Sequence, residues 1–358
     1  MSIDLLLSPV ISKAKVMEIL TSPEIMADLF RTRLSFLLPP GATLAECRPT
    51  VLRKRLGSRQ VLCYRLFFAE SLPSMMVVVK RYADKSEGER TYAIMRMLWE
   101  NGFNRDSELK IPEPFCYLSE LRLLVQGKAR GILLLNNLKK SAPAALDRMR
   151  GAARWLAKLH RLDVDCPGIN PPPDDEAAIR LFVRRVAKRV PHFQPRLDGL
   201  ACNLFARIEG FADRPRALVH GDFQCENIIV GAKKVTVVDL DGFCRSDPAR
   251  DLGYFIAQTR TKIFKGSVSP VSVIPALRAF WGEYRSAISE GERPDYSSRT
   301  CVFAAIKCLE SVYYVTDVLP GGDMEVVGQL IDDAERFSGA ERVEEALELS
   351  QSSWAERG

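Results

Sequence analysis

Short hydrophobic runs, rich in β-branched residues, dominate the chain between residues 43 and 127. Five such runs are bounded by turn residues, at 50–56, 61–69, 74–82, 115–121 and 122–127. Runs of this length between Gly, Pro and Ser signals are typical of antiparallel strands. The middle run contains Val77, Val78 and Val79, which we expect to be buried on both faces. The pattern therefore predicts a small sheet of about five strands.

Hydrophobic residues recur at helical spacing in the remaining segments. One helix is predicted over 84–101, with an apolar face at Tyr92, Met95 and Leu98. Beyond residue 131 the helical pattern predominates, and the stretch 144–162 predicts a central buried helix. The other predicted helical segments are 22–38, 174–217, 270–291, 297–318, 323–337 and 339–354.

A strand-rich first part and a helix-rich second part are typical of the α+β class. With 358 residues, the chain is long enough for two hydrophobic cores. We expect an N-terminal helical extension over 1–40, a small sheet lobe with one helix over 41–127, and a helical lobe over 128–358. The extension is expected to pack on the first lobe.

Composition narrows the function classes. The chain is 47% hydrophobic and 27% charged, with a formal charge of +6, and no basic run is interleaved with aromatic residues. This argues against nucleic acid as a partner. The 9 cysteines are scattered singly, without a C-x-x-C pair, which favours free thiols over disulfides or zinc.

Targeting signals are not recognised. Asp4 precedes the short N-terminal apolar run, and no basic segment comes before it, which does not resemble a signal peptide. No stretch approaches the roughly 20 apolar residues that a membrane span needs. We expect a cytoplasmic protein without a membrane partner.

The chemistry is concentrated between residues 218 and 254. His220-Gly221-Asp222 is followed five residues later by Asn227, and then by two short hydrophobic runs joined by a GAKK turn. Asp239 and Asp241 end the second run, and strand alternation would place both on one side. Asp247-Pro248 marks a helix start, with Asp251 in the first turn.

This set suits phosphoryl transfer, which needs a hydroxyl held in line with a phosphate whose charge Mg²⁺ neutralises. Asp222 would accept or orient the hydroxyl proton. Asn227 and Asp239 would offer hard oxygen ligands to Mg²⁺. Each of these residues alone is explained as well by a turn or by a solvated strand end. Their occurrence together favours a phosphotransferase site.

The order H-G-D-x-x-x-x-N, V-D-L-D and D-P-x-x-D-L resembles the aminoglycoside phosphotransferase and choline kinase family. The resemblance implies a bilobal protein-kinase-like α+β fold with ATP and Mg²⁺ as cofactors. It implies Asp222 as the catalytic aspartate and Asn227 and Asp239 as Mg²⁺ ligands, with Asp241 as a further candidate ligand. It also implies that Asp251 anchors the loop and that His220 supports it, while His160 is expected to be a packed core histidine.

A kinase-like site also needs a lysine on the third strand to reach the nucleotide phosphates. Lys80 ends that strand, although a surface lysine there is the alternative. Glu87 and Glu89 in the next helix are candidate partners for Lys80. We favour Glu89, but both could instead stabilise the helix N-terminus.

Two further segments could contact the nucleotide. The turn at Gly57, with Arg59, could cover the phosphates through backbone N–H groups, although a plain hairpin turn is the alternative. Backbone groups at Gln126 and Lys128, after the last strand, could bind the adenine edge.

We therefore predict an ATP- and Mg²⁺-dependent kinase for a hydroxyl of a small molecule such as an amino alcohol, a sugar or an aminoglycoside-like compound. A nucleotide-binding pseudokinase with a regulatory or scaffolding role is the alternative. A protein kinase is disfavoured because H-G-D replaces H-R-D and no A-P-E segment follows.

The charge pattern of the sequence leaves the charge of the acceptor open, because two charged segments suggest opposite answers. A basic run disfavours a polycationic acceptor, whereas an acidic tail would suit one. The residues are Arg180, Arg184, Arg185, Lys188 and Arg189 in the run, and Asp332, Asp333, Glu335, Glu341, Glu344, Glu345 and Glu348 in the tail.

Overall fold

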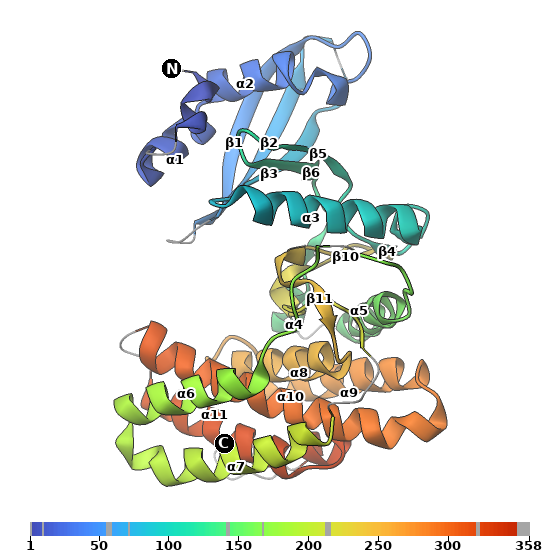
Figure 1. Cartoon of the computed structure of the whole chain (residues 1–358). Coiled ribbons are helices and arrows are strands. Elements are labelled where there is room, and N and C mark those ends of the chain that lie inside the picture. Colours follow the sequence, from blue (N-terminus) through green and yellow to red (C-terminus); the bar gives the residue numbers. More distant parts are fainter. Residues whose placement is uncertain are drawn as a thin grey trace. The chain divides into compact units, whose positions relative to one another are not determined.

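The chain folds into two compact units (Figure 1). This computed structural model describes residues 2–8, 11–54, 59–70, 72–140, 144–166, 168–211, 216–319 and 323–348. The first unit comprises Met1–Asp106 and Ile111–Arg130, and the second comprises Ser107–Lys110 and Gly131–Gly358. Residues 107–110 join the second unit because the strand they contain pairs with a strand of that unit. The three-segment division proposed from the sequence stays a prediction.

The first unit is built on a five-stranded antiparallel sheet in the order β1-β2-β3-β6-β5. The strands are β1 (Leu44–Lys54), β2 (Gln60–Phe68), β3 (Met75–Arg81), β5 (Pro114–Leu118) and β6 (Leu123–Gly127). Val77 and Val79 of the central strand β3 are buried. The predicted sheet and its five strands are confirmed.

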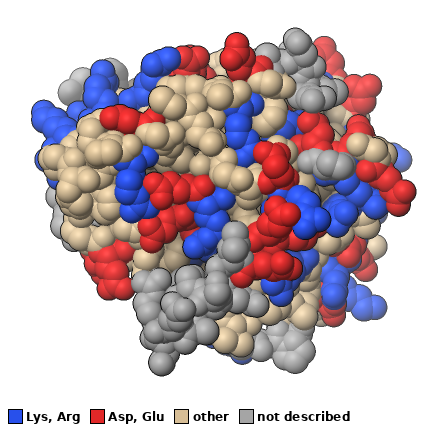
Figure 2. Space-filling model, turned by 90° about the horizontal axis from the view of Figure 1, so that it is seen from below, with Lys and Arg blue, Asp and Glu red and all other residues tan. Residues whose placement is uncertain are grey.

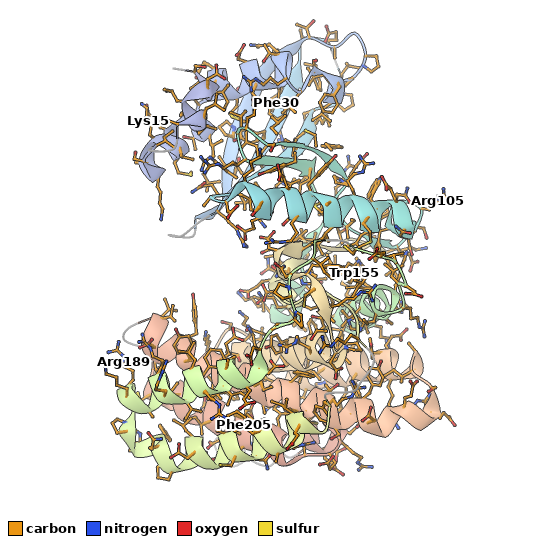
Figure 3. The ribbon with its side chains drawn as sticks, viewed as in Figure 1. Lys15, Phe30, Arg105, Trp155, Arg189 and Phe205 are labelled. Carbon is orange, nitrogen blue, oxygen red and sulfur yellow. The ribbon has the colours of Figure 1, made fainter. Side chains whose placement is uncertain are left out.

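The N-terminal segment packs on this sheet through α1 (Lys13–Thr21) and α2 (Pro23–Thr32). Ser22 caps α2 by accepting a hydrogen bond from the backbone of Ile25 at 3.3 Å, and proline follows at the first helical position. Phe30, labelled in Figure 3, meets Tyr64 edge to face at 5.7 Å. The expectation that this segment packs on the first unit is confirmed.

Helix α3 (Lys85–Leu98) carries the two candidate partners of Lys80. Asp84 caps it, accepting a hydrogen bond from the backbone of Ser86 at 2.7 Å. The helix continues into a π-helical turn, η3 (Trp99–Phe103), where Gly102 adopts a φ of 103°. The helix predicted over 84–101 is therefore present, and its last turn is π-helical.

The second unit is mostly helical and contains two small sheets. Its longer helices are α4 (Leu134–Lys139), α5 (Ala144–His160), α6 (Asp175–Arg189), α7 (Gln194–Glu209), α8 (Ala249–Phe264), α9 (Pro270–Ser286), α10 (Arg293–Tyr313) and α11 (Met324–Gly339). One sheet has the order β4-β10-β9-β7, formed by β4 (Leu109–Lys110), β10 (Val235–Val237), β9 (Ile228–Val230) and β7 (Ile132–Leu133). The other pairs β11 (Cys244–Ser246) with β8 (Ala217–Val219). The α+β class is thus confirmed.

Short helical turns complete the description. They are η1 (Ile3–Leu7), η2 (Ser35–Leu37), η4 (Pro191–Phe193), η5 (Cys225–Asn227), η6 (Leu240–Gly242), η7 (Glu290–Glu292) and η8 (Tyr314–Val318), and η8 is π-helical. None of the helices in the described part of the chain has the length and apolar character of a membrane span.

The core of the second unit is organised around α5 and α8. Trp155 of α5 is fully buried, stacks on Phe223 with ring centroids 5.8 Å apart, and donates from its indole nitrogen to the carbonyl of Lys110 at 2.8 Å (Figure 3). Helix α8 touches α10 at Gly253, where a Cβ would lie 2.5 Å from the backbone nitrogen of Ala304. Only glycine permits so close an approach of two helices.

Candidate active site

The loop from His220 to Asn227 follows strand β8 and turns sharply at Gly221. This glycine has a φ of 78°, and an added Cβ would collide with the backbone carbonyl of Gly242. A side chain here would meet both a disfavoured backbone conformation and fixed backbone atoms. The glycine between His220 and Asp222 is therefore required by the close packing of the loop on the Asp241–Phe243 segment.

Asp251 anchors this loop from the first turn of α8. Its fully buried carboxylate accepts hydrogen bonds from the backbone N–H groups of His220, at 2.7 Å, and Gly221, at 2.9 Å. His160 contacts the same carboxylate at 3.2 Å. Burial acts to raise the pKa of Asp251, but hydrogen bonds and charge from His160 and His220 outweigh it, so the pKa lies below its usual value. The predicted anchoring role is confirmed.

Two histidines support the loop rather than face a substrate. His220 is fully buried, and its Nε2 lies 3.1 Å from the carbonyl of Val238. His160 contacts the hydroxyl of Tyr284 through Nδ1 at 2.7 Å and Asp251 through Nε2. Both predictions, a supporting His220 and a packed core His160, are confirmed.

One face of α8 runs along the rest of the loop. Phe255 packs on Phe223 at 5.3 Å between ring centroids, and Thr259 lies 3.3 Å from the sulfur of Cys225. One turn later, Lys262 pairs with Glu226 at 2.7 Å. These contacts recur at helical spacing from Asp251 onward, so a single rigid helix positions the loop along its whole length.

Asp222 and Asn227 are brought together by this arrangement. Asn227 donates from Nδ2 to the backbone carbonyl of Asp222 at 2.9 Å and to its carboxylate at 3.0 Å. Gln224 also donates to both carboxylate oxygens of Asp222, at 3.0 and 2.9 Å. Burial raises the pKa of Asp222, with Asp239 adding to the effect, while Lys307 and His220 oppose it.

Asp239 reaches the same place through the β9–β10 hairpin. The last pair of the hairpin joins Ile228 to Val237, and the backbone of Val238 donates to the carbonyl of Asn227 at 2.9 Å. Val238 therefore lies opposite Asn227, and Asp239 is the next residue in the chain. It adopts a left-handed conformation, with φ 70° and ψ 62°, which is uncommon for a residue other than glycine and is concentrated at functional sites.

Asp241 is not placed by strand alternation, so that argument from the sequence was wrong. Strand β10 ends at Val237, and Asp241 lies in the short turn η6 after the left-handed Asp239. The side chain of Asn170 donates to the carbonyls of Asp241 and Phe243, each at 3.0 Å. The turn is thus fixed by a residue that sequence reasoning overlooked.

The donor set of this region fits Mg²⁺. In the ranges that the structure describes, no three or more His, Cys, Asp or Glu side chains gather in a metal-binding group. Such a group is not required, since protein-bound Mg²⁺ usually has one or two carboxylates, with phosphate and water completing its shell. Because Asn227 uses its amide nitrogen on Asp222, its amide oxygen is turned to the other side. Asn227 and Asp239 therefore remain the proposed ligands, with Asp241 as a third candidate.

Sequence reasoning also missed Lys307. It lies on α10, is buried, and pairs with Glu310 at 2.9 Å. Its ammonium lies 4.8 Å from the ring centroid of Tyr254 and interacts electrostatically with Asp222. The signal was present: Lys307 is the one charged residue in the otherwise apolar stretch Cys301–Leu309.

In the first unit, Tyr82 brings together two residues of the predicted nucleotide site. The Lys80 ammonium lies 5.1 Å from the ring centroid of Tyr82, and the Arg59 guanidinium lies 5.9 Å from it. Arg59 also forms an ion pair with Glu87. The predicted turn at Gly57 lies outside the described residues.

The other predicted nucleotide contacts stay predictions. The Glu89 carboxylate lies 2.5 Å from the Ser119 hydroxyl and 3.8 Å from the ammonium of Lys85. Gln126 lies inside β6, between β3 and β5, and Lys128 directly follows that strand. Glu87 is the carboxylate that reaches the Tyr82 cluster, through Arg59.

Most residues of the two charge clues form ion pairs within the fold. In the basic run, Arg185 and Arg189 pair with Asp317, and Arg180 pairs with Glu176. The tail carboxylates also have arginine partners: Asp332 and Glu335 with Arg196, Asp333 with Arg260, Glu341 with Arg207, Glu344 with Arg285, and Glu345 with Arg342. Figure 2 shows acidic and basic side chains interspersed on one face of the molecule.

Comparisons with known proteins concern the sequence family and the fold. The sequence model of the phosphotransferase enzyme family matches residues 67–287. A search of curated proteins returns no match. A choline/ethanolamine kinase family protein from Mesorhizobium loti is 16% identical, with a TM-score of 0.56 over 90% of this chain and 98% of its own.

Two further solved structures share the fold. Ethanolamine kinase of Plasmodium vivax is 10% identical, with a TM-score of 0.55 over 93% of this chain and 92% of its own. The GDP complex of a wild-type aminoglycoside 2'-phosphotransferase is 13% identical, with a TM-score of 0.52 over 87% of this chain and 98% of its own. At these identities the likeness demonstrates a common fold.

Proposed function

This chain belongs to the phosphotransferase enzyme family, and we propose that it transfers the γ-phosphoryl group of ATP, with Mg²⁺, to a hydroxyl of a small molecule. The observation that carries the proposal is the convergence of Asp222, Asn227 and Asp239 within the second unit. Three oxygen-bearing side chains from a loop and a hairpin meet there as phosphoryl transfer requires.

Asp222 takes the hydroxyl proton of the acceptor. Gln224 and Asn227 hold its carboxylate in place through three hydrogen bonds. Because these donors fix the orientation of the carboxylate, it need not reorganise as the proton moves. Burial and Asp239 raise the pKa of Asp222, which makes it a stronger base than a solvated aspartate.

Mg²⁺, when bound, neutralises the phosphate charge that develops during transfer. Asn227 and Asp239 hold it, and Asp241 is the further candidate. The left-handed backbone of Asp239 supports this assignment, since such a conformation is retained where the surrounding structure requires it.

The first unit binds the nucleotide. Lys80 contacts the phosphates, and Arg59 assists from the neighbouring strand start. Burial of Lys80 against the Tyr82 ring supports the assignment, because a buried ammonium needs an anionic or aromatic partner. Glu89 and Glu87 are the candidate partners of Lys80, and Glu87 is the one that reaches the Tyr82 ring through Arg59. Backbone groups at Gln126 and Lys128 bind the adenine.

The test is ATP consumption with a panel of amino alcohols, sugars and aminoglycosides. We expect Asp239→Ala and Asp222→Asn to lower turnover by at least about a hundredfold, with an unchanged unfolding midpoint. Asp147→Ala removes an exposed carboxylate of α5 and serves as the matched control. Normal turnover in Asp239→Ala would exclude the assignment.

A nucleotide-binding pseudokinase is the alternative function. It predicts that ATP protects the protein against heat and that no member of the panel is phosphorylated. Equal, background ATP consumption by the wild type and Asp222→Asn, together with that protection, would favour it. The comparisons do not support this alternative.

A further inference from the structure

We propose that the groove between helices α6 and α7 is a docking site for an amphipathic helix of a partner protein that carries carboxylates along one edge. The groove has a volume of about 930 Å³ and is lined by residues of both helices. Asp222, Asn227 and Asp239 are not among these residues. The inference therefore goes beyond the proposed function and does not depend on phosphoryl transfer.

The groove has the length and direction of a helix. Helices α6 and α7 lie side by side and are joined by the short turn η4, so they run in opposite directions (Figure 1). The lining extends from Ala177 to Lys188 on α6 and from Gln194 to Phe205 on α7. Each stretch is about 17 Å long, or three helical turns. A third helix of similar length fits this surface in shape.

Other faces of the two helices are packed against the rest of the second unit. Phe182 of α6 stacks on Tyr313 of α10 with ring centroids 5.1 Å apart. Arg196 of α7 forms an ion pair with Glu335 of α11 at 2.5 Å. The groove is therefore a face of this helix pair that the described part of the fold leaves open.

The floor of the groove is apolar. Ala187 and Ala201 are 7% and 8% exposed, and Phe205, labelled in Figure 3, is half-buried. Leu181 of α6 is 38% exposed. Small side chains let a partner helix approach closely, and the larger ones offer apolar surface to its anchoring residues.

The charge of the groove is one-sided. Arg180, Arg184 and Lys188 follow one another at four-residue spacing on α6 and line the groove. Among the described residues of the lining, Asp198 of α7 is the single acid, and it accepts a hydrogen bond from Gln194 at 2.7 Å. The α6 edge is therefore cationic over its whole length.

Two of these cations have no acidic partner within the described part of the chain. Ion pairs occupy Arg180, Arg185 and Arg189 of the basic run, but not Arg184 or Lys188. Both side chains are exposed. They are therefore available to carboxylates from outside the chain.

Shape and charge together specify the occupant. Cations spaced one turn apart on α6 match carboxylates spaced one turn apart on a helix that lies beside it. An apolar stripe on that helix covers the floor, as in other complexes in which a helix binds a groove. A small anion would pair with the cations but leave an apolar floor of about 17 Å uncovered.

Three synthetic peptides of about 15 residues each test the docking site on the full-length chain. The first has a leucine stripe at helical spacing and glutamates along one edge. The second has lysine in place of glutamate, and the third has serine in place of leucine. Binding is followed by fluorescence anisotropy at about 0.1 M salt. We expect the first peptide to bind at least about tenfold more tightly than either of the others.

Arg184→Glu/Lys188→Glu reverses the charge of the α6 edge at exposed positions, so we expect it to prefer the lysine peptide. Lys233→Glu/Lys234→Glu makes the same change in net charge at the exposed turn between β9 and β10, and should retain the wild-type order. Cys202→Trp narrows the groove from an exposed position of α7 without changing its charge, and should weaken binding of the first peptide. Thermal unfolding shows that each variant is folded.

Equal binding of the glutamate and lysine peptides to the wild type would overturn the inference, whatever the variants do. An unchanged order in folded Arg184→Glu/Lys188→Glu would also overturn it, as would an equal loss in Lys233→Glu/Lys234→Glu, which would assign the effect to net charge.

Two further results would assign the groove to another occupant and thereby overturn the inference. One is a dimer in sedimentation experiments that Arg184→Glu/Lys188→Glu abolishes, which would identify a second copy of this chain. The other is flotation with phosphatidylglycerol vesicles, abolished by the same variant, without peptide binding. None of these measurements requires nucleotide, so failure of the proposed function is seen separately, in the ATP-consumption assay.

Discussion

The two units bury different kinds of side chain. In the first unit, a continuous apolar cluster joins α1, α2 and the sheet, and the pair Lys15–Glu18 lies at the surface with side chains 39% and 54% exposed. In the second unit, Arg260 and Asp333 form an ion pair at 2.7 Å with side chains only 1% and 2% exposed. Among the described residues, Lys80 and Arg81 are the charged side chains that the first unit buries.

The buried ion pairs of the second unit connect particular helices. Arg250 of α8 pairs with Asp175 at the start of α6, and Arg260 of α8 pairs with Asp333 of α11. Apolar contacts tolerate small shifts, whereas a buried charge pair is stable only in good geometry. The comparison therefore shows that α8, which anchors the His220–Asn227 loop, is fixed by directional contacts, while the first unit is held mainly by burial of apolar surface.

The largest expected effect comes from breaking the Arg260–Asp333 pair. Asp333→Ala leaves Arg260 buried without this partner, and we expect the second unit to lose about 3–5 kcal/mol of unfolding free energy. Urea unfolding followed by a probe in the second unit measures it. The double variant Arg260→Met/Asp333→Leu should recover most of the loss, and a double variant as unstable as the single one would contradict this account.

A cavity in the first unit should lower the unfolding free energy somewhat less than loss of the Arg260–Asp333 pair. Its effect should also depend differently on salt and pH. Leu29 of α2 is fully buried in the apolar cluster. Leu29→Ala is expected to destabilise the first unit by about 3 kcal/mol through lost burial and a residual cavity. The loss should be independent of salt and of pH between 5 and 8, measured by urea titration at each condition. A strong salt dependence would mean that charge also stabilises this unit.

Asp251→Asn tests how much the anchor of the loop contributes to stability, and its expected effect is intermediate in size. The variant retains the shape but lacks the charge that accepts two backbone N–H bonds, so we expect a loss of about 2 kcal/mol. The folded-state pKa of Asp251 is lowered, so its contribution is complete above the unfolded pKa of about 3.9 and decreases as the pH falls toward the folded value.

The stability difference between wild type and Asp251→Asn should therefore be constant from pH 7 to about pH 4 and close below it. Thermal unfolding over this pH range measures the difference. A gap that closes already near pH 6 would show that ionisation of Asp251 is not the source of the difference.

The smallest effect is expected at the surface of the first unit. Lys15→Ala removes an exposed partner of Glu18 and should change stability by no more than about 0.5 kcal/mol. The same urea titration applies. A change above about 1 kcal/mol would show that surface pairs contribute to the first unit as well.

Sequence reasoning predicted the main elements of the fold and proposed the candidate site. Alternating β-branched runs predicted the five strands of the first sheet, because strand geometry imposes that pattern on any half-buried sheet. The Asp-Pro signal predicted α8, whose backbone N–H at Ala249 donates to Asp247 at 2.9 Å. The assignment of Asp251 as the loop anchor succeeded through the order of motifs that resembles the family, although Asp251 lies 31 residues after His220.

Sequence reasoning failed where packing between distant segments of the chain determines the position of a residue. The alternation argument for Asp241 was wrong because Asp239 leaves the strand with a left-handed backbone, which the surrounding structure, not local preference, imposes. The basic run of α6 and the acidic tail suggested ligand charges, but their partners lie more than a hundred residues away in several cases, as with Arg185 and Asp317.

The amino-acid sequence thus determined which elements form and which residues are candidates for the chemistry, since periodicity, capping and motif spacing are local properties. Only the tertiary structure decided that Lys307 of α10 lies against Tyr254 of α8 and that Asn170 holds the turn at Asp241. Such neighbours are set by the contact of α8 and α10 at Gly253 and by the packing of distant loops, and no pattern within one segment encodes them.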